Sequence, residues 1–167
     1  MSIKHEMICL SRLKLHSKMP YLKFLIEFGS ESYDYYKYSI KKSNKLFIYT
    51  FNSDIKAIVG ISDTISIVQS INRPCWCICK VQFICCTYDS LLYTILKDID
   101  MYAISHKQSQ IHITHVTEHQ SIFIDNNYYP IEYDICTHCR MNHNLNIQHD
   151  YIKDVENDST RILFINK

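Results

Sequence analysis

The sequence is nearly devoid of glycine: only Gly29 and Gly60 occur among its 167 residues. Loops that hold a nucleotide phosphate with bare backbone amides need closely spaced glycines, so Walker-type and Rossmann-type nucleotide sites are excluded. The chain also lacks an excess of either charge, because 18 Lys and Arg residues stand against 17 Asp and Glu residues, for a formal net charge of +1. We therefore expect no general affinity for nucleic acid or for anionic membranes.

The N-terminus lacks a long apolar run. Basic and polar residues interrupt the apolar ones between positions 1 and 17, so we expect neither a signal peptide nor a membrane span, and a cytoplasmic protein. The eight cysteines are then expected to be reduced and mostly buried. The heavy use of Ile, Tyr, Asn and Lys is typical of AT-rich genomes, such as those of large DNA viruses and parasites.

The first part of the chain is rich in β-branched and aromatic residues separated by turn signals. An opening strand or edge helix is predicted between Met1 and Leu15, a helix between Met19 and Gly29, and a tyrosine-rich helical turn over Ser32–Ile40. Two apolar runs, 45–52 and 55–68, flank the turn signal Asn52-Ser53-Asp54 and predict a hairpin. A break follows at Gln69–Pro74.

The middle of the chain alternates strands and helices. The predicted elements are a strand over Trp76–Thr87, a helix opening near Asp89, a strand over Gln110–Val116, a short helix over Thr117–Asn127 and a strand over Ile131–Cys136. The first of these helices shows the clearest period, with apolar residues at Leu91, Leu92, Ile95, Leu96, Ile99 and Ala103. Asn142–Ser159 is polar and predicted to be exposed, and Arg161–Ile165 could add an edge strand.

The run Lys80–Thr87, which reads KVQFICCT, is similar to the signature EINFLCVH of the N-myristoyltransferases. The segments around residues 35–51, 56–62, 91–103 and 111–116 also resemble elements of that family in the same order. The family consists of two fused units of the GNAT (N-acetyltransferase) fold, and this chain is long enough for one. The resemblance, which covers roughly residues 20–135, therefore implies a single GNAT-like domain over 1–167, an α/β (α+β) fold with a mixed central sheet flanked by helices. Residues 136–160 would form a polar extension containing Cys and His.

By the same resemblance the chain corresponds to the unit that holds the acyl-CoA. Phe83 and Ile84 match the positions whose backbone amides form the oxyanion hole, and Cys85, Cys86 and Ser90 would line the cofactor site if CoA binding is retained. In the N-myristoyltransferases and in the GNAT acetyltransferases, a basic or Gly-rich loop follows this strand. That loop receives the CoA diphosphate at the N-terminus of the next helix. Here the connection is Tyr88-Asp89-Ser90, which has no Gly, Lys or Arg and one carboxylate.

Other residues could carry chemistry at the end of the sheet. Glu118, His115 and His112 are candidates for a general base, although His and Glu at such positions are usually structural. Tyr128 and Tyr129 lie near the place of an acid tyrosine in the superfamily, with aromatic packing as the favoured alternative. The pair Cys136 and Cys139 is one half of a zinc pattern, and four zinc ligands are conceivable: Cys136, Cys139, His143 and His149. A single CxxC also arises by chance in a chain rich in Cys and His.

Three functions stay open at the level of sequence. The favoured hypothesis is a GNAT-like domain that has lost acyl-CoA binding, has no cofactor, and acts as an interaction or scaffold protein with a protein partner. The second is an active acyl-CoA-dependent N-acyltransferase. The third is a zinc-dependent binding module built on Cys136 and Cys139.

Overall fold

A computed structural model describes residues 3–9, 18–64, 68–70, 73–75, 78–114, 116, 118–130 and 150–155. It divides into two compact units. One comprises Met1–Ser62 and Val81–Leu92, and the other comprises Asp63–Lys80 and Tyr93–Lys167. No helix in the described part of the chain is both long enough and apolar enough to cross a membrane.

The first unit contains four strands in the order β1-β2-β3-β6. Antiparallel pairing joins β1 (Lys4–Cys9) to β2 (Lys45–Phe51) and β2 to β3 (Asp54–Thr64), and β6 spans Ile78–Cys86. Asn52 and Ser53 link β2 to β3 with φ values of 51° and 70°, as a two-residue hairpin turn requires. The predicted hairpin is therefore confirmed. For the N-terminal segment, where a strand or an edge helix was expected, the structure shows a strand, β1.

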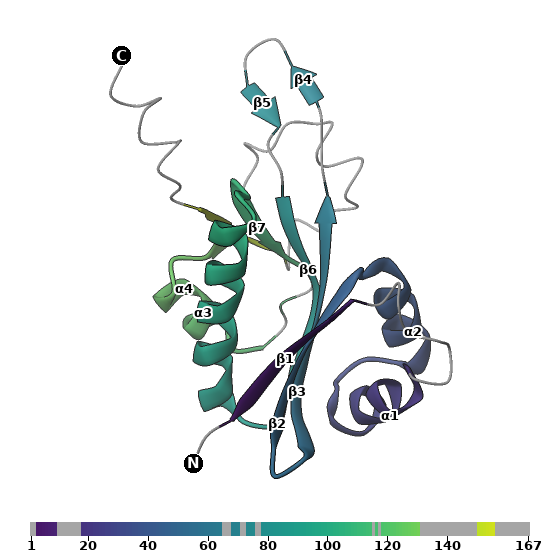
Figure 1. Ribbon diagram of the computed structural model, residues 1–167. Coiled ribbons are helices and arrows are strands. Elements are labelled where there is room, and N and C mark those ends of the chain that lie inside the picture. Colours follow the sequence, from purple (N-terminus) through teal and green to yellow (C-terminus); the bar gives the residue numbers. More distant parts are fainter. Residues whose placement is uncertain are drawn as a thin grey trace. The chain divides into compact units, whose positions relative to one another are not determined.

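Two helices cover one side of these strands, as Figure 1 shows for α1 (Met19–Phe28) and α2 (Tyr33–Lys42). α1 begins with Pro20 in its first turn, as predicted. α2 is a full helix rather than the single turn that the sequence indicated, and its N-terminus is capped by Ser32, whose hydroxyl oxygen accepts the Tyr35 N–H at 3.2 Å. The core under the two helices is formed by Leu22, Phe24, Leu25, Tyr36, Ile40, Leu46, Ile48, Ile58, Phe83 and Cys85.

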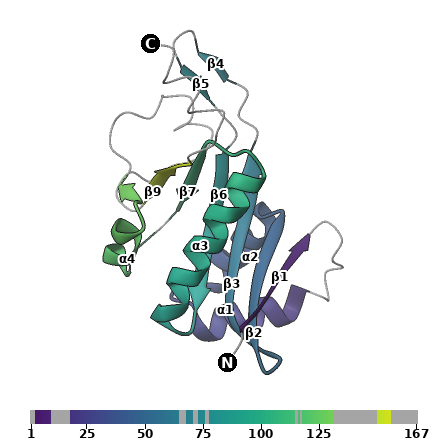
Figure 2. The same cartoon turned by 60° about the vertical axis from the view of Figure 1, so that its left-hand side comes forward.

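In the described part of the second unit, three strands of the larger sheet lie in the order β7-β9-β8. β9 (Tyr151–Asp154) pairs antiparallel with both β7 (Gln110–Ile113) and β8 (Tyr129–Pro130), and Figure 2 shows β9 beside β7. α4 (Gln120–Asp125) lies between β7 and β8 in the chain. α3 (Asp89–Ser105) buries all six of its predicted apolar residues, Leu91, Leu92, Ile95, Leu96, Ile99 and Ala103.

The structure corrects two predictions. The segment Asn142–Ser159 was expected to be exposed, but it contains β9, where pairing on both edges leaves Tyr151 and Ile152 each only 4% exposed. The predicted break at Gln69–Pro74 instead holds β4 (Val68–Ser70) and β5 (Arg73–Cys75), which pair antiparallel as a hairpin. The strands predicted over Ile131–Cys136 and Arg161–Ile165 lie outside the described residues.

Candidate functional site

The end of β6 and the first turn of α3 carry the residues that were predicted to handle acyl-CoA. The end of β6 is fixed to the start of β3, because the backbone N–H and the hydroxyl of Thr87 both donate to the Lys56 carbonyl, at 2.9 and 3.1 Å. Exposed Tyr88 follows, and α3 begins at Asp89. The predicted strand and helix are therefore present, joined only by Thr87 and Tyr88.

Phe83 belongs to the core of the first unit. Its side chain is 3% exposed and packs edge-on against Tyr36, with the ring centroids 5.9 Å apart. The ring also covers Gly60 so closely that a Cβ there would lie 2.3 Å from a ring carbon. Ile84, next along the strand, is half-buried. The contacts of Phe83 hold β6 in place, while the role of the Phe83 and Ile84 amides as oxyanion donors stays a prediction.

Polar contacts also hold β6 within the first unit. The Tyr35 hydroxyl donates to the Gln82 carbonyl at 3.3 Å, and the Gln82 amide nitrogen donates to the Ser62 hydroxyl at 2.6 Å. Gln82 thus connects α2, β6 and β3 just before Phe83. Sequence reasoning did not assign Gln82 a role, because a polar residue inside an apolar strand gives no sign of its partners.

Cys85 and Cys86 both lie in β6 and hold their protons at neutral pH. Burial, and next the neighbouring Cys86 thiol, raise the pKa of Cys85 to about 12. Burial, and next the Asp89 carboxylate, raise the pKa of Cys86 to about 11, against the lowering effect of a hydrogen bond from the Tyr88 backbone. Because the thiolate is the nucleophile and the metal ligand, neither cysteine is activated for such chemistry.

The N-terminus of α3 is acidic. Asp89 lies in its first turn with Ser90 exposed beside it, and the Leu91 N–H donates to the Tyr88 carbonyl at 3.0 Å. A carboxylate at this end of a helix is stabilised by the helix dipole by about 0.3–1 kcal/mol. Asp89 therefore places a stabilised negative charge at the N-terminus of α3.

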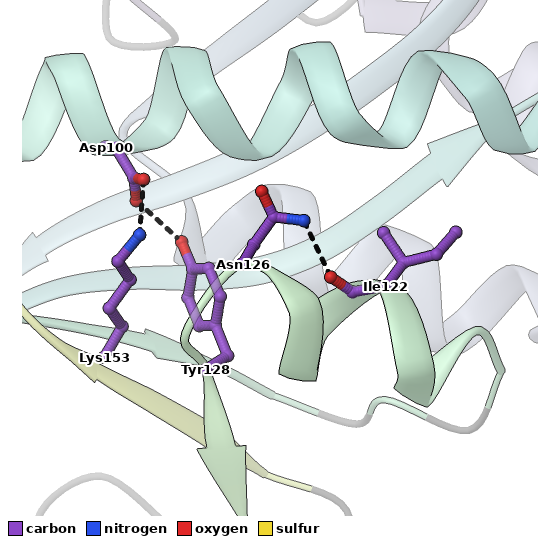
Figure 3. A network of polar contacts seen from close by, with 5 residues as sticks. All are labelled: Asp100, Ile122, Asn126, Tyr128 and Lys153. Atoms are coloured by element: carbon purple, nitrogen blue, oxygen red, sulfur yellow. Dashed lines mark hydrogen bonds and ion pairs between the residues drawn. The ribbon is translucent and has the colours of Figure 1, made fainter.

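A polar network lies in the second unit, where α3, β9 and the residue before β8 meet (Figure 3). Lys153 Nζ lies 2.6 Å from Asp100 Oδ2, and the Tyr128 hydroxyl donates to Asp100 Oδ1 at 3.1 Å. The Lys153 ammonium also lies 5.2 Å from the centre of the Tyr128 ring. Nearby, the Asn126 side-chain nitrogen donates to the Ile122 carbonyl at 2.7 Å and closes the end of α4.

Tyr128 is engaged within this network. Its side chain is 1% exposed, and burial, followed by the charge of Asp100 and the hydrogen bond to it, raises the pKa of Tyr128 well above its ordinary value. A buried hydroxyl that already donates to a carboxylate is poorly placed to protonate a ligand. Whether Tyr128 acts as an acid or serves aromatic packing stays a prediction.

The other described acid–base candidates lie in different parts of the chain: His112 in β7, Glu118 before α4 and Tyr129 in β8. The Tyr129 hydroxyl donates to Asp154 at 3.0 Å, and burial together with that contact raises the pKa of Tyr129 to about 12. Glu118 is exposed and lies 3.8 Å from the His119 ring nitrogen. His112 is buried in β7, at 1% exposure. His115 lies outside the described residues, so a base role for Glu118, His112 or His115 stays a prediction.

The predicted metal ligands Cys136, Cys139, His143 and His149 all lie outside the described residues. Within the described part of the chain, no group of three or more His, Cys, Asp or Glu side chains could hold a metal ion. Zinc binding therefore stays a prediction. Sequence reasoning missed Asp100 and Lys153. The only sign in the sequence that Asp100 could have a structural partner is its position beside the apolar stripe of α3.

No protein-family model and no curated protein matches this chain in sequence. In three dimensions the chain is similar to GNAT acetyltransferases. A GNAT-family acetyltransferase from Staphylococcus aureus Mu50 gives a TM-score of 0.58 at 11% identity, over 92% of this chain and 100% of that chain. The catalytic domain of the Tetrahymena GCN5 histone acetyltransferase, solved with coenzyme A, gives 0.58 at 7% identity, over 92% of each chain.

An N-acetylglutamate synthase from Neisseria gonorrhoeae, solved with coenzyme A and N-acetyl-glutamate, gives a TM-score of 0.58 at 9% identity. The match covers 92% of this chain and 35% of the synthase, so the chain spans about a third of that protein. At these identities the likeness shows the fold alone. The chain therefore has the GNAT fold, and the predicted α/β class with a mixed sheet flanked by helices is confirmed.

Proposed function

We propose that this chain is a GNAT-fold domain that has lost acyl-CoA binding and acts as a non-catalytic interaction or scaffold protein. The main observation in support of this proposal is Asp89 in the first turn of α3, together with the lack of any Gly, Lys or Arg from Thr87 to Ser90. In the families that the sequence resembles, including the acyl-CoA half of the N-myristoyltransferases, this is where the CoA diphosphate is received.

Electrostatics at this junction support the proposal. A unit negative charge about 4 Å from a phosphate raises the energy by about 1–4 kcal/mol, depending on exposure. The charge of Asp89 reaches the end of β6, since it contributes to the raised pKa of Cys86. The Leu91 amide, one of the donors that a helix N-terminus offers to an anion, is directed to the Tyr88 carbonyl. The charge of Asp89 and the direction of the Leu91 N–H both disfavour the binding of a diphosphate at the N-terminus of α3.

Thermal unfolding of the full chain with acetyl-CoA and with myristoyl-CoA tests the proposal. A ligand present at about 100 times its Kd stabilises the folded state by about 2.7 kcal/mol, which raises the Tm of a domain of this size by several degrees. We expect no shift with either thioester at about 1 mM. A CoA-binding GNAT acetyltransferase serves as the positive control, and a Tm rise of several degrees in this chain would overturn the proposal.

The second candidate function is an active acyl-CoA-dependent N-acyltransferase. The observation that favours it is the fold, because the structures of similar shape include two solved with coenzyme A bound. In that case the Phe83 and Ile84 amides are the proposed oxyanion donors, held by the packing of Phe83 on Gly60. Transfer of labelled acetyl or myristoyl groups to an amine by the folded wild-type chain would establish this function. No transfer across a broad set of amines would count against it.

A further inference from the structure

α2 carries two adjacent rows of exposed residues. One row contains Tyr33, Lys37 and Lys41, and the other contains Asp34, Tyr38 and Lys42, each spaced by four residues. The opposite face is buried by Tyr36, Ser39 and Ile40. One side of α2 therefore serves the core, while the other presents tyrosine and lysine side chains to solvent.

Each exposed tyrosine is paired with a lysine one turn further along. Lys37 Nζ lies 5.7 Å from the centre of the Tyr33 ring, and Lys42 Nζ lies 5.3 Å from the centre of the Tyr38 ring. Tyr33 is nevertheless 46% exposed and Tyr38 is 54% exposed. The ammonium groups thus lie over the rings, and both tyrosine side chains remain exposed.

The stability of the helix explains only part of this pattern. Asp34 in the first turn and Lys41 and Lys42 in the last turn suit the helix dipole. The dipole does not account for two solvent-exposed tyrosines, nor for Lys37 one turn before Lys41, where like charges repel. Among the described residues, no carboxylate forms an ion pair with Lys37, Lys41 or Lys42. The face therefore carries three lysines against one aspartate, without internal neutralisation.

We infer that this face of α2 is a docking surface for an acidic segment of a partner protein, an inference that rests on the proposed interaction function. Three ammonium groups complement carboxylates, and exposed tyrosines supply contact area at low entropic cost. The surface is about 14 Å long from Tyr33 to Lys42, which a short extended peptide covers.

Single-stranded nucleic acid fits this surface less well. Bases stack on free aromatic faces, whereas each tyrosine here has a lysine ammonium over its ring. The balanced total charge also provides no wider positive field along which a polyanion would extend. A peptide carboxylate, in contrast, can contact the ammonium while the partner's apolar atoms meet the ring edge.

Fluorescence anisotropy with a labelled decapeptide of Glu and Asp, at low salt, tests this inference. We expect the double variant Lys37→Gln/Lys41→Gln to bind about tenfold more weakly than the wild-type chain. Lys23→Gln/Lys97→Gln removes the same charge from exposed sites on α1 and α3 and should bind within about twofold of wild type. Tyr38→Ala, which leaves the charge unchanged, should weaken binding about threefold. Gln keeps the helix propensity of Lys, and melting curves verify folding.

Any one of three results would overturn the inference. These are no binding of the acidic peptide, equal binding of the peptide by the α2 variants and the wild-type chain, and tighter binding of a labelled oligothymidylate than of the peptide. Failure of the proposed function is read separately, from a Tm shift with acetyl-CoA. Such a shift refutes the loss of CoA binding whatever the peptide does. If acetyl-CoA gives no Tm shift and the α2 variants bind the peptide as well as the wild-type chain does, only the α2 docking surface is refuted.

Discussion

At the residue scale, Gly60 is the position that the packing of Phe83 constrains most tightly. A Cβ at residue 60 would lie 2.3 Å from the Phe83 ring and 2.5 Å from the Ser43 hydroxyl oxygen. We predict that Gly60→Ala destabilises the folded state by about 1–3 kcal/mol, as overpacking of a buried site does. Denaturant unfolding measures the loss.

A double-mutant cycle with Phe83→Leu isolates the cause of that loss. The smaller side chain should relieve part of the clash, so the two changes together should cost less than the sum of their separate effects. Strict additivity, or a Gly60→Ala variant as stable as wild type, would contradict the packing described for β6.

Tyr128 gives a prediction for alkaline pH. Its pKa is raised in the folded state, so the folded chain keeps this proton while the unfolded chain loses it near the ordinary value of about 10. The stability associated with Tyr128 is therefore complete below pH 10 and declines as the pH rises above it. Tyr128→Phe should be less stable than wild type at pH 8, and this gap should narrow by about 1.4 kcal/mol at pH 11.

Tyr93→Phe is the matched control for this pH dependence, because Tyr93 is 47% exposed on α3. Its unfolding free energy should follow that of wild type at each pH. A gap between wild type and Tyr128→Phe that stays constant from pH 8 to pH 11 would show that the Tyr128 proton is not held by burial and Asp100.

At the scale of the element, β9 ties the second unit together. Ile152 is 4% exposed within a strand that pairs with β7 and β8, and its neighbour Lys153 forms the ion pair with Asp100. We predict that Ile152→Ala lowers the unfolding free energy by about 2–4 kcal/mol. Ile124→Ala removes the same atoms from a side chain that is 56% exposed and should cost less than about 1 kcal/mol. Equal losses of unfolding free energy in the two variants would contradict the burial of β9 in the core.

The elements also show how far a single sequence can predict structure. α3 was predicted with six of its buried apolar residues, and only Tyr102 was missed, because a helix of seventeen residues with a regular apolar period carries a strong signal. α2 was underestimated because tyrosine occurs on both of its faces, with Tyr36 buried and Tyr38 exposed, so polarity shows no period. β9 was missed because a strand of four residues carries too little pattern, and its partners lie far away in the chain.

The candidate site was predictable only where it is local. Phe83 was assigned from the resemblance of the run Lys80–Thr87 to a family signature, and Asp89 from the short connection that follows it. The structure places Phe83 in β6 and Asp89 in the first turn of α3. The partnership of Asp100 with Lys153 joins residues 53 positions apart, and that of Tyr35 with Gln82 joins residues 47 apart. Such pairs arise from tertiary packing, and no spacing rule in one sequence indicates them.

At the scale of the whole molecule, the chain combines the GNAT fold with an acidic start to α3. The fold is specified by apolar residues spread along the chain, so the proposed loss of a cofactor site that depends on a few residues after β6 is compatible with the fold. If the proposed loss of CoA binding is correct, function rests on exposed faces such as that of α2, where lysine and tyrosine side chains lie together.

Isothermal titration of the full chain with acetyl-CoA and myristoyl-CoA tests the loss of CoA binding most directly, because it reports binding without requiring catalysis. Asp89→Asn, which removes the carboxylate from the α3 N-terminus, serves as a parallel sample. We predict no measurable heat of binding to the wild-type chain for either thioester up to about 1 mM, so any binding free energy is weaker than about −4 kcal/mol. A saturable isotherm with a micromolar Kd for the wild-type chain would contradict this prediction.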